Sequence, residues 1–264
     1  MTVRGGRTVG VVGGSGLDSL FEGGIRKAHR VATPWGAPSG PIEEGEVGGV
    51  RVLFLARHGP GHTIPPHRVN YRANVDALRS LGAEAIVTVS SVGSLREVLT
   101  PGTFVLPSQF IDFTKGRSTT FFDGGRVYHV SLADPFCPDL QRRAVAAGAA
   151  VGTPFSEGKT YLCVEGPRFS TRAESALFRT WADIIGMTLV PEVTLARERG
   201  LCYACLAMVT DFDVWAEHPV EAREIVEVMH RNADRMKRLL GQLLPTLGAP
   251  ATCSCANALD DAGV

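Results

Sequence analysis

Apolar positions along this 264-residue chain fall into short, nearly continuous runs and longer amphipathic segments. The short runs predict buried strands, and the segments with helical spacing predict helices. Strands are expected over Thr8–Val12, Val50–Ala56, Ala85–Val89, Thr103–Leu106, Val127–Leu132, Thr160–Val164 and Leu201–Val209. Helices are expected over Tyr71–Leu81, Cys137–Ala147, Thr171–Trp181, Pro191–Arg199 and Val220–Leu244.

This alternation of strands and helices predicts the α/β class. No internal repeat or linker divides the chain, so we expect one domain over residues 1–246 and a weakly ordered tail over residues 247–264. Capping boxes at Ser94–Glu97 and Thr171–Glu174 predict two helix starts.

Charge and hydropathy narrow the possible functions. The 27 basic and 27 acidic residues cancel, which argues against a general nucleic-acid binder but leaves a local anion pocket open. No apolar run approaches the ~18 residues of a membrane-spanning helix. The first residues lack the long apolar stretch of a signal peptide, so we expect a cytoplasmic protein with no membrane partner.

The six cysteines do not resemble a secreted disulfide framework. Cys202 and Cys205 have CxxC spacing, but on a strand they would face opposite sides. Cys253 and Cys255 form a CxC pair in a polar tail, where they could oxidise, bridge subunits or, as we favour, stay free and mobile. The four cysteines outside this pair are interpreted as small buried hydrophobes: Cys137, Cys163, Cys202 and Cys205.

Two carboxylates follow the last predicted strand, at Asp211 and Asp213. Ligands bind beyond the carboxyl ends of strands in open α/β sheets, and residues two apart in an extended segment point the same way. Both carboxylates could therefore face one ligand. The alternative interpretation is an acidic loop that caps a helix.

Groups suited to phosphate follow three other predicted strands. A glycine-rich loop carries the Ser15 hydroxyl, Arg57 and His58 stand together, and Ser90 and Ser91 end a third strand. Glycines let backbone N–H groups approach an anion, arginine is a planar fork for phosphate oxygens, and the neighbouring His58 is expected to add a further donor. The joint pattern predicts an anion site. Phe169 could stack on a base and Met187 could lie beside a sugar, although both residue types are more often core.

Seven motifs in this order make the chain recognisable: GGSGLD, ARHG, HRVNYRAN, SSVGSL, EGPRFSTRAE, GMTLVPEV and VTDFDVW. From about Thr8 to about Leu244 the sequence resembles the methylthioadenosine phosphorylases, in the trimeric branch of the purine nucleoside phosphorylase family. The resemblance implies a single three-layer α/β/α domain with a central mixed, partly barrel-like sheet. It also implies a homotrimer, or a hexamer of two trimers, with phosphate as co-substrate and neither a metal nor an organic cofactor.

The resemblance also implies roles for individual residues. The phosphate site maps onto Ser15, Arg57, His58, Ser90, Ser91 and Thr188. The base site maps onto Phe169, Ser170, Thr210, Asp211 and Asp213, and the ribose site onto Met187. The 5′-group pocket maps onto His129 of a neighbouring subunit, Ala222 and Ile225.

The implied reaction is phosphorolysis of methylthioadenosine to adenine and 5-methylthioribose 1-phosphate. Asp211 would donate a proton to purine N7, which requires a pKa raised by burial and by Asp213. Two aspartates beside Ser170 favour adenine, since relatives that prefer 6-oxopurines have Asn in the base loop and Glu at the position of Ser170. The alternatives are another purine nucleoside (5′-deoxy- or 5′-halo-adenosine, adenosine, inosine or methylthioinosine) and a nucleoside-binding protein without catalysis, which would need no phosphate.

Overall fold

The computed structural model describes residues 7–14, 17, 20–21, 27–216, 222–260 and 262–264. Its strands are β1 (Thr8–Gly13), β2 (Lys27–His29), β3 (Ile42–Val47), β4 (Val50–Ala56), β5 (Ala83–Ser94), β6 (Phe104–Phe113), β7 (Phe155–Val164), β8 (Ile184–Gly186) and β9 (Cys202–Asp211). Its helices are α1 (Tyr71–Ser80), α2 (Pro138–Ala150), α3 (Arg172–Phe178), α4 (Glu192–Glu198) and α5 (Ala222–Thr246). Short 3₁₀ turns are η1 (Pro60–His62), η2 (Pro66–Arg68) and η3 (Cys255–Asn257).

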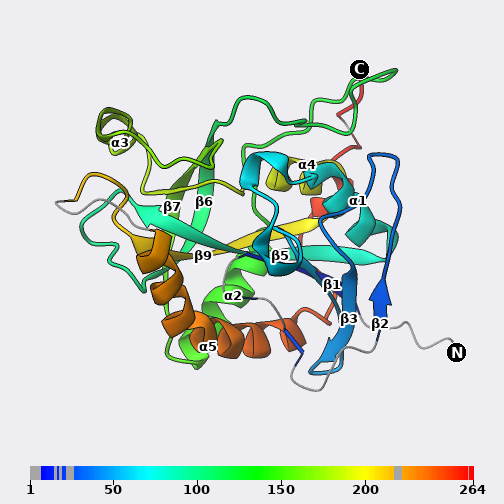
Figure 1. Ribbon diagram of the computed structural model, residues 1–264. Helices are drawn as coiled ribbons and strands as arrows, with labels where there is room; N and C mark the ends of the chain where they lie inside the picture. Colours follow the sequence, from blue (N-terminus) through cyan, green and yellow to red (C-terminus); the bar gives the residue numbers. More distant parts are fainter. Residues whose placement is uncertain (1–6, 15–16, 18–19, 22–26, 217–221, 261) are drawn as a thin grey trace, which may run out of the picture.

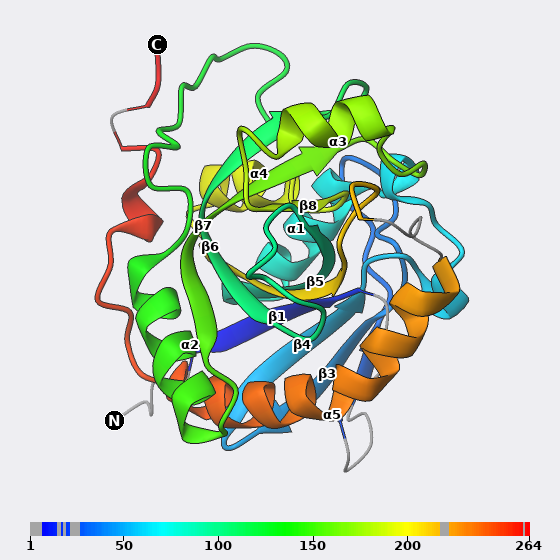
Figure 2. The ribbon, with the colours of Figure 1, turned by 90° about the vertical axis from the view of Figure 1, so that its left-hand side faces the viewer.

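The strands form one mixed sheet that closes on itself at one end. The order is β2-β3-β4-β1-β5-β8-β7-β6-β9, and β9 also pairs with β5. The last five strands therefore form a barrel, seen nearly end-on in Figure 2. β1 is parallel to both its neighbours, whereas β8 runs antiparallel to β5, and β6 antiparallel to β9. The predicted mixed, partly barrel-like sheet is confirmed.

Helices cover the sheet on two sides. α1 and α4 pack together on one side, and α2 and α5 pack together on the other (Figure 1). The side chains of β9 alternate between the two cores, because successive residues of a strand point to opposite faces. Tyr203 and Cys205 belong to one core, and Cys202 and Ala204 to the other, as the sequence predicts for the two cysteines.

The predicted strand over Val127–Leu132 is wrong. Only an isolated bridge between Tyr128 and Gly263 forms there, and Val127 is 52% exposed. An apolar run becomes a strand only where a neighbouring strand can satisfy its backbone, and this loop lies apart from the sheet. Conversely, β2, β3 and β8 were not expected, because they are short or carry charged residues such as Glu43 and Glu44.

One of the two predicted capping boxes begins a helix. Thr171 accepts a hydrogen bond from the Glu174 backbone N–H, and the Glu174 carboxylate accepts one from the Thr171 N–H, so α3 starts as expected. Ser94 instead ends β5, and its hydroxyl accepts a 3.1 Å hydrogen bond from the Arg96 N–H in a tight turn. Local hydrogen bonding of serine suits turns as well as helix starts.

The C-terminal segment lies against the body of the protein beside α2 (Figure 2). Leu247 and Cys255 are 0% and 3% exposed, and both belong to the core shared by α2 and α5. This placement differs from the weakly ordered tail that the polar composition suggests. Within the described residues, no helix has both the length and the apolar character that crossing a bilayer requires.

Candidate active site

A cavity of about 420 Å³ opens at the carboxyl ends of β4, β5 and β9. Its volume lies within the usual range for small-molecule sites, and its place at the strand ends is where α/β sheets bind ligands. Eleven residues that the sequence analysis singled out line it, from segments far apart in the chain: Arg57, His58, Ser90, Ser91, Phe169, Ser170, Met187, Thr188, Thr210, Asp211 and Asp213.

Four other residues were also predicted to belong to the site. Ser15 lies outside the described residues. Ala222 and Ile225 belong to the first turns of α5, but their side chains are also outside the description. His129 is exposed on the long loop between β6 and α2, where its backbone N–H donates a 2.8 Å hydrogen bond to Ala262.

Arg57 forms a buried ion pair that the sequence analysis did not predict. Its Nε lies 3.0 Å from Oε2 of Glu192, and both side chains are 1% exposed. Thr88 Oγ1 and the Val89 carbonyl also accept from the guanidinium, and Tyr203 donates a 2.9 Å hydrogen bond to Glu192. Burial acts to lower the pKa of Arg57, but the Glu192 charge and hydrogen bonds outweigh it and raise that pKa. The guanidinium therefore stays charged in a fixed orientation.

Glycine is required at two points of the cavity wall. A Cβ on Gly14 would lie 3.1 Å from Nη1 of Arg57 and 3.1 Å from the Val89 carbonyl. A Cβ on Gly93 would lie 2.8 Å from Oδ1 of Asp211. All three distances are shorter than most Cβ contacts in proteins. These glycines therefore let the backbone lie close to the charged groups that line the cavity.

His58 is held as a neutral ring. Its Nδ1 lies 2.8 Å from the Ile64 carbonyl, which can only accept, so Nδ1 carries the proton. Burial and the nearby Arg57 charge lower the pKa of His58 to about 4. At neutral pH its Nε2 is therefore an acceptor, not the further donor that the sequence analysis expected. Such an acceptor suits the O–H of a hydrogen phosphate.

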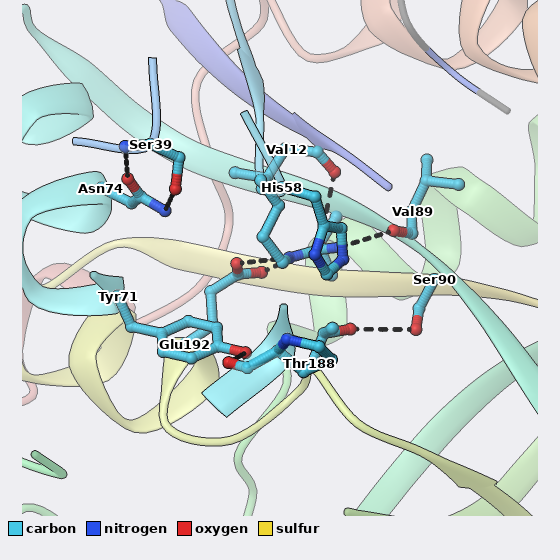
Figure 3. Close-up of polar contacts among 12 residues, drawn as sticks. Val12, Ser39, His58, Tyr71, Asn74, Val89, Ser90, Thr188 and Glu192 are labelled. Atoms are coloured by element: carbon cyan, nitrogen blue, oxygen red, sulfur yellow. Dashed lines mark hydrogen bonds and ion pairs between the residues drawn. The ribbon is translucent and has the colours of Figure 1, made fainter. Parts of the chain in front are cut away.

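Hydroxyl groups complete this end of the cavity. Ser90 Oγ lies 3.2 Å from the Tyr161 hydroxyl and 3.3 Å from Thr188 Oγ1. The facing side chains of Ser90 and Thr188 are visible in Figure 3. Both line the cavity and both are buried, at 3% and 8% exposure. Rotatable hydroxyls in a dry site can donate to an anion without moving their oxygen atoms.

The two aspartates differ in their surroundings. Both carboxylate oxygens of Asp211 accept 2.8 Å hydrogen bonds, from Thr210 Oγ1 and from the Asp213 N–H. Asp213 is 4% exposed, has a positive φ of 51°, and its Oδ2 has no hydrogen-bond partner among the described residues. Burial raises the pKa of Asp213. A raised pKa was expected at Asp211, and the structure shows one at its buried neighbour Asp213.

The opposite wall of the cavity is aromatic and incompletely hydrogen-bonded. Phe169 is 38% exposed and lines the cavity beside Ser170, whose buried hydroxyl makes no hydrogen bond of ordinary length within the described chain. Met187 packs so closely on Gly166 that a Cβ there would lie 2.6 Å from its sulfur. A planar ligand would stack on Phe169 and offer polar edge atoms to Ser170 and Asp213.

Sequence reasoning missed the groups that hold this site in place: Thr88, Tyr161, Glu192 and Tyr203. Glu192 starts a predicted helix, which is a sufficient local explanation for a carboxylate. The tyrosines lie in strands as ordinary core residues. Only the fold reveals that Glu192 meets a buried arginine 135 positions earlier in the chain. His62 also lines the cavity, with its ring stacked 4.3 Å from that of His58.

Comparison with known proteins defines the class. Residues 8–245 match the Phosphorylase superfamily, and the chain belongs to this family. The S-methyl-5′-thioadenosine phosphorylase of Thermofilum pendens is 54% identical over 96% of this chain and 97% of its own. The protein of the same name from Nitrosopumilus maritimus is 48% identical, again covering 96% and 97%.

Solved structures agree. The methylthioadenosine phosphorylase of Schistosoma mansoni in complex with adenine superposes with a TM-score of 0.91 at 38% identity, over 96% of each chain. A methylthioadenosine phosphorylase from an antarctic soil metagenomic library gives a TM-score of 0.91 at 41% identity, over 99% of this chain and 93% of that one. The likeness therefore extends over the whole fold.

Proposed function

We propose that this protein catalyses the phosphorolysis of S-methyl-5′-thioadenosine, giving adenine and 5-methylthioribose 1-phosphate. The observation that supports this proposal is that one cavity contains both an anion-binding group of side chains and a pair of carboxyl groups. Arg57, Ser90 and Thr188 line one part of it, and Asp211 and Asp213 line another. Full-length relatives with this activity in their names support the choice of substrate.

The phosphate end would hold the nucleophile. Arg57 and the hydroxyls of Ser90, Ser91 and Thr188 would bind phosphate oxygens, while neutral His58 would accept from the phosphate O–H. Ser15 would add a further hydroxyl. Phosphate held there lies beneath C1′ of the ribose, where its charge stabilises the oxocarbenium-like transition state before it captures the sugar.

The base end would receive the leaving group. As the glycosidic bond breaks, negative charge moves onto the purine and N7 becomes more basic. Burial raises the pKa of Asp213, which favours a proton on the carboxyl pair. We assign the contact with N7 to Asp211, which is less buried than Asp213. The increasing basicity of N7 would draw the proton of the carboxyl pair onto Asp211, which donates it. Asp213 and Ser170 would then accept from the 6-amino group, Thr210 would hold Asp211, and Phe169 would stack on the ring.

The ribose and the 5′ group would be enclosed by more than one copy of the chain. Met187 would contact the sugar, and Ala222 and Ile225 would form one side of the 5′ pocket. His129 is exposed outside this copy's cavity, so it can serve a neighbouring copy in a homotrimer. We place the enzyme in the cytoplasm and assign the chemical step no metal or organic cofactor.

A paired assay with purified protein tests the proposal. Adenine release from methylthioadenosine and hypoxanthine release from inosine would each be followed with and without inorganic phosphate. We expect rapid, phosphate-dependent adenine release and little hypoxanthine. Preference for inosine would show that the base-site assignment is wrong. Binding of nucleoside without turnover would mean that the protein is not a phosphorylase.

A further inference from the structure

Four cysteine thiols meet at the far end of β9 from the active site. Cys202 begins β9, Cys137 immediately precedes α2, and Cys253 and Cys255 come from the C-terminal segment. Their sulfur atoms all lie within 4.8 Å of one another, and all four cysteines are free. At ~3.3 Å per residue, nine steps of the strand separate this cluster from Asp211 by roughly 30 Å. The cluster is therefore separate from the nucleoside site.

The spacing of the sulfur atoms suits a central metal ion. Cys253 Sγ lies 3.5 Å from Cys137 Sγ and 3.4 Å from Cys202 Sγ. Four thiolates at about 2.3 Å from a tetrahedral zinc would be separated from one another by about 3.8 Å. The remaining pairs lie within 4.8 Å of one another, so shifts of about 1 Å or less would bring all four sulfur atoms into bonding range.

The surroundings of the cluster favour thiolates. Arg7 is 7% exposed, and its Nη2 donates a 2.8 Å hydrogen bond to Cys202 Sγ. The Leu140 N–H, in the first turn of α2, donates to Cys137 Sγ at 3.5 Å. A guanidinium and a helix N-terminus both stabilise negative charge, and such outer donors typically orient metal ligands. The excess charge of four thiolates around a divalent ion is therefore partly compensated.

The cluster is also closed to solvent. Cys137, Cys202 and Cys255 are 1%, 3% and 3% exposed, and only Cys253 is half-buried. A hydrogen bond of 2.9 Å from Thr252 to Asp139 fixes the C-terminal segment beside α2 at the same point. Four protein ligands with no open position are typical of structural zinc, whereas catalytic zinc keeps one position for water.

We propose that Cys137, Cys202, Cys253 and Cys255 bind one zinc ion, which fastens the C-terminal segment to the barrel and to the start of α2. Thiolate ligands in tetrahedral arrangement select zinc or iron among common metals, and a closed set without redox function suits zinc. Binding would release the remaining thiol protons and add the free energy of metal binding to that of folding.

Metal content measured on protein purified under argon without chelators tests the site. Elemental analysis should find one zinc per chain in the wild type and a loss of at least ten-fold in Cys253→Ser. Cys205→Ala is the matched control, because Cys205 lies in the same strand but faces the other core. It should retain its zinc. Full zinc in Cys253→Ser would overturn the proposal.

Cobalt gives a readout that does not depend on any variant. Reduced, metal-free wild type titrated with Co²⁺ should develop thiolate-to-cobalt charge-transfer bands and tetrahedral d–d bands at one equivalent. Added zinc should remove both, and should raise the unfolding temperature of the metal-free protein. Absence of cobalt bands, or disulfides within the cluster in non-reduced peptides from the argon-purified protein, would overturn the proposal.

Discussion

The two ends of the active-site cavity are built differently. At the phosphate end, Arg57 is paired with Glu192, and Ser90 is hydrogen-bonded to Thr188. At the base end, Asp213 Oδ2 and the Ser170 hydroxyl are buried and make no hydrogen bond of ordinary length among the described residues, although Ser170 lies near enough to lower the pKa of Asp213. One end is thus complete before any ligand binds, whereas the other contains polar atoms that a purine would satisfy.

This difference suggests how the free energy of binding is divided. Preorganised groups at the phosphate end stabilise charge without rearranging during the reaction. Unsatisfied buried polar atoms cost about 1–3 kcal/mol each, and that cost is removed when a ligand with matching edge atoms binds. Changes at the base end should therefore act on rate and base choice, and changes beneath the phosphate should also act on stability.

Asp211→Asn should have the largest effect on catalysis. Loss of the proton donor at N7 should lower kcat for methylthioadenosine by about 10²–10⁴-fold, the usual contribution of a general acid. Unfolding free energy should change little, because an amide still fills the same space. Steady-state kinetics measures the effect, with Asp234→Asn on the exposed face of α5 as control. A larger loss for Asp213→Asn than for Asp211→Asn would move the acid to Asp213.

Glu192→Gln should act mainly on the fold of the phosphate end. Removing one partner of a buried ion pair leaves the Arg57 charge uncompensated and should cost about 3–5 kcal/mol of unfolding free energy. KM for phosphate should change together with stability. Denaturant unfolding measures the first effect. Glu227→Gln is the control, since its pair with Arg223 is exposed and worth little. Equal costs for the two variants would contradict the comparison.

His58 should give stability a dependence on pH. Its folded pKa of about 4 lies below the ordinary value of 6.5, so the unfolded chain binds more protons between these values. Its contribution is therefore fully present above pH 6.5 and lost as the pH falls to 4, on the order of 3 kcal/mol at most. The unfolding free energy of the wild type and of His58→Gln would be measured as a function of pH, and the difference between the two curves gives the His58 contribution. His230→Gln, on an exposed part of α5, should leave the profile unchanged.

Phe169→Ala should have the smallest of these effects. Loss of base stacking should weaken nucleoside binding by about 1–3 kcal/mol, which raises KM roughly 5- to 150-fold. KM for phosphate should stay within about two-fold, because Phe169 belongs to the base end. Phe169→Tyr keeps the ring and should bind almost normally. A large change in phosphate KM for the alanine variant would show that the two ends are not separate.

Sequence patterns predicted the main strands and the groups that line the cavity well, because both leave local signals. Long apolar runs predicted β4, β5 and β9, and hydroxyls, arginine and aspartate at their ends predicted the site. Glu192 and Tyr203 left no such signal, since a carboxylate at a helix start and a tyrosine in a strand have ordinary structural explanations. Their role depends on contact with Arg57, which only the assembled sheet creates.

Protonation states were harder to predict than positions. The expected donor role of His58 is wrong for a neutral ring whose Nδ1 faces the Ile64 carbonyl. Burial raises the pKa of Asp213, which the sequence makes nearly equivalent to Asp211. The spacing of the cysteines likewise did not predict that four thiols from three distant segments would meet. The protonation states and the thiol cluster depend on burial and on contacts between distant residues, and a sequence pattern contains neither.

The most direct measurement is ³¹P NMR of a reaction containing methylthioadenosine, inorganic phosphate and the enzyme, with adenine followed in parallel. We expect inorganic phosphate to disappear as a sugar 1-phosphate resonance grows, in step with adenine and in equal amount. If adenine is released while the phosphate signal stays unchanged, water attacks C1′. That result would contradict the assignment of Arg57, Ser90 and Thr188 to phosphate binding.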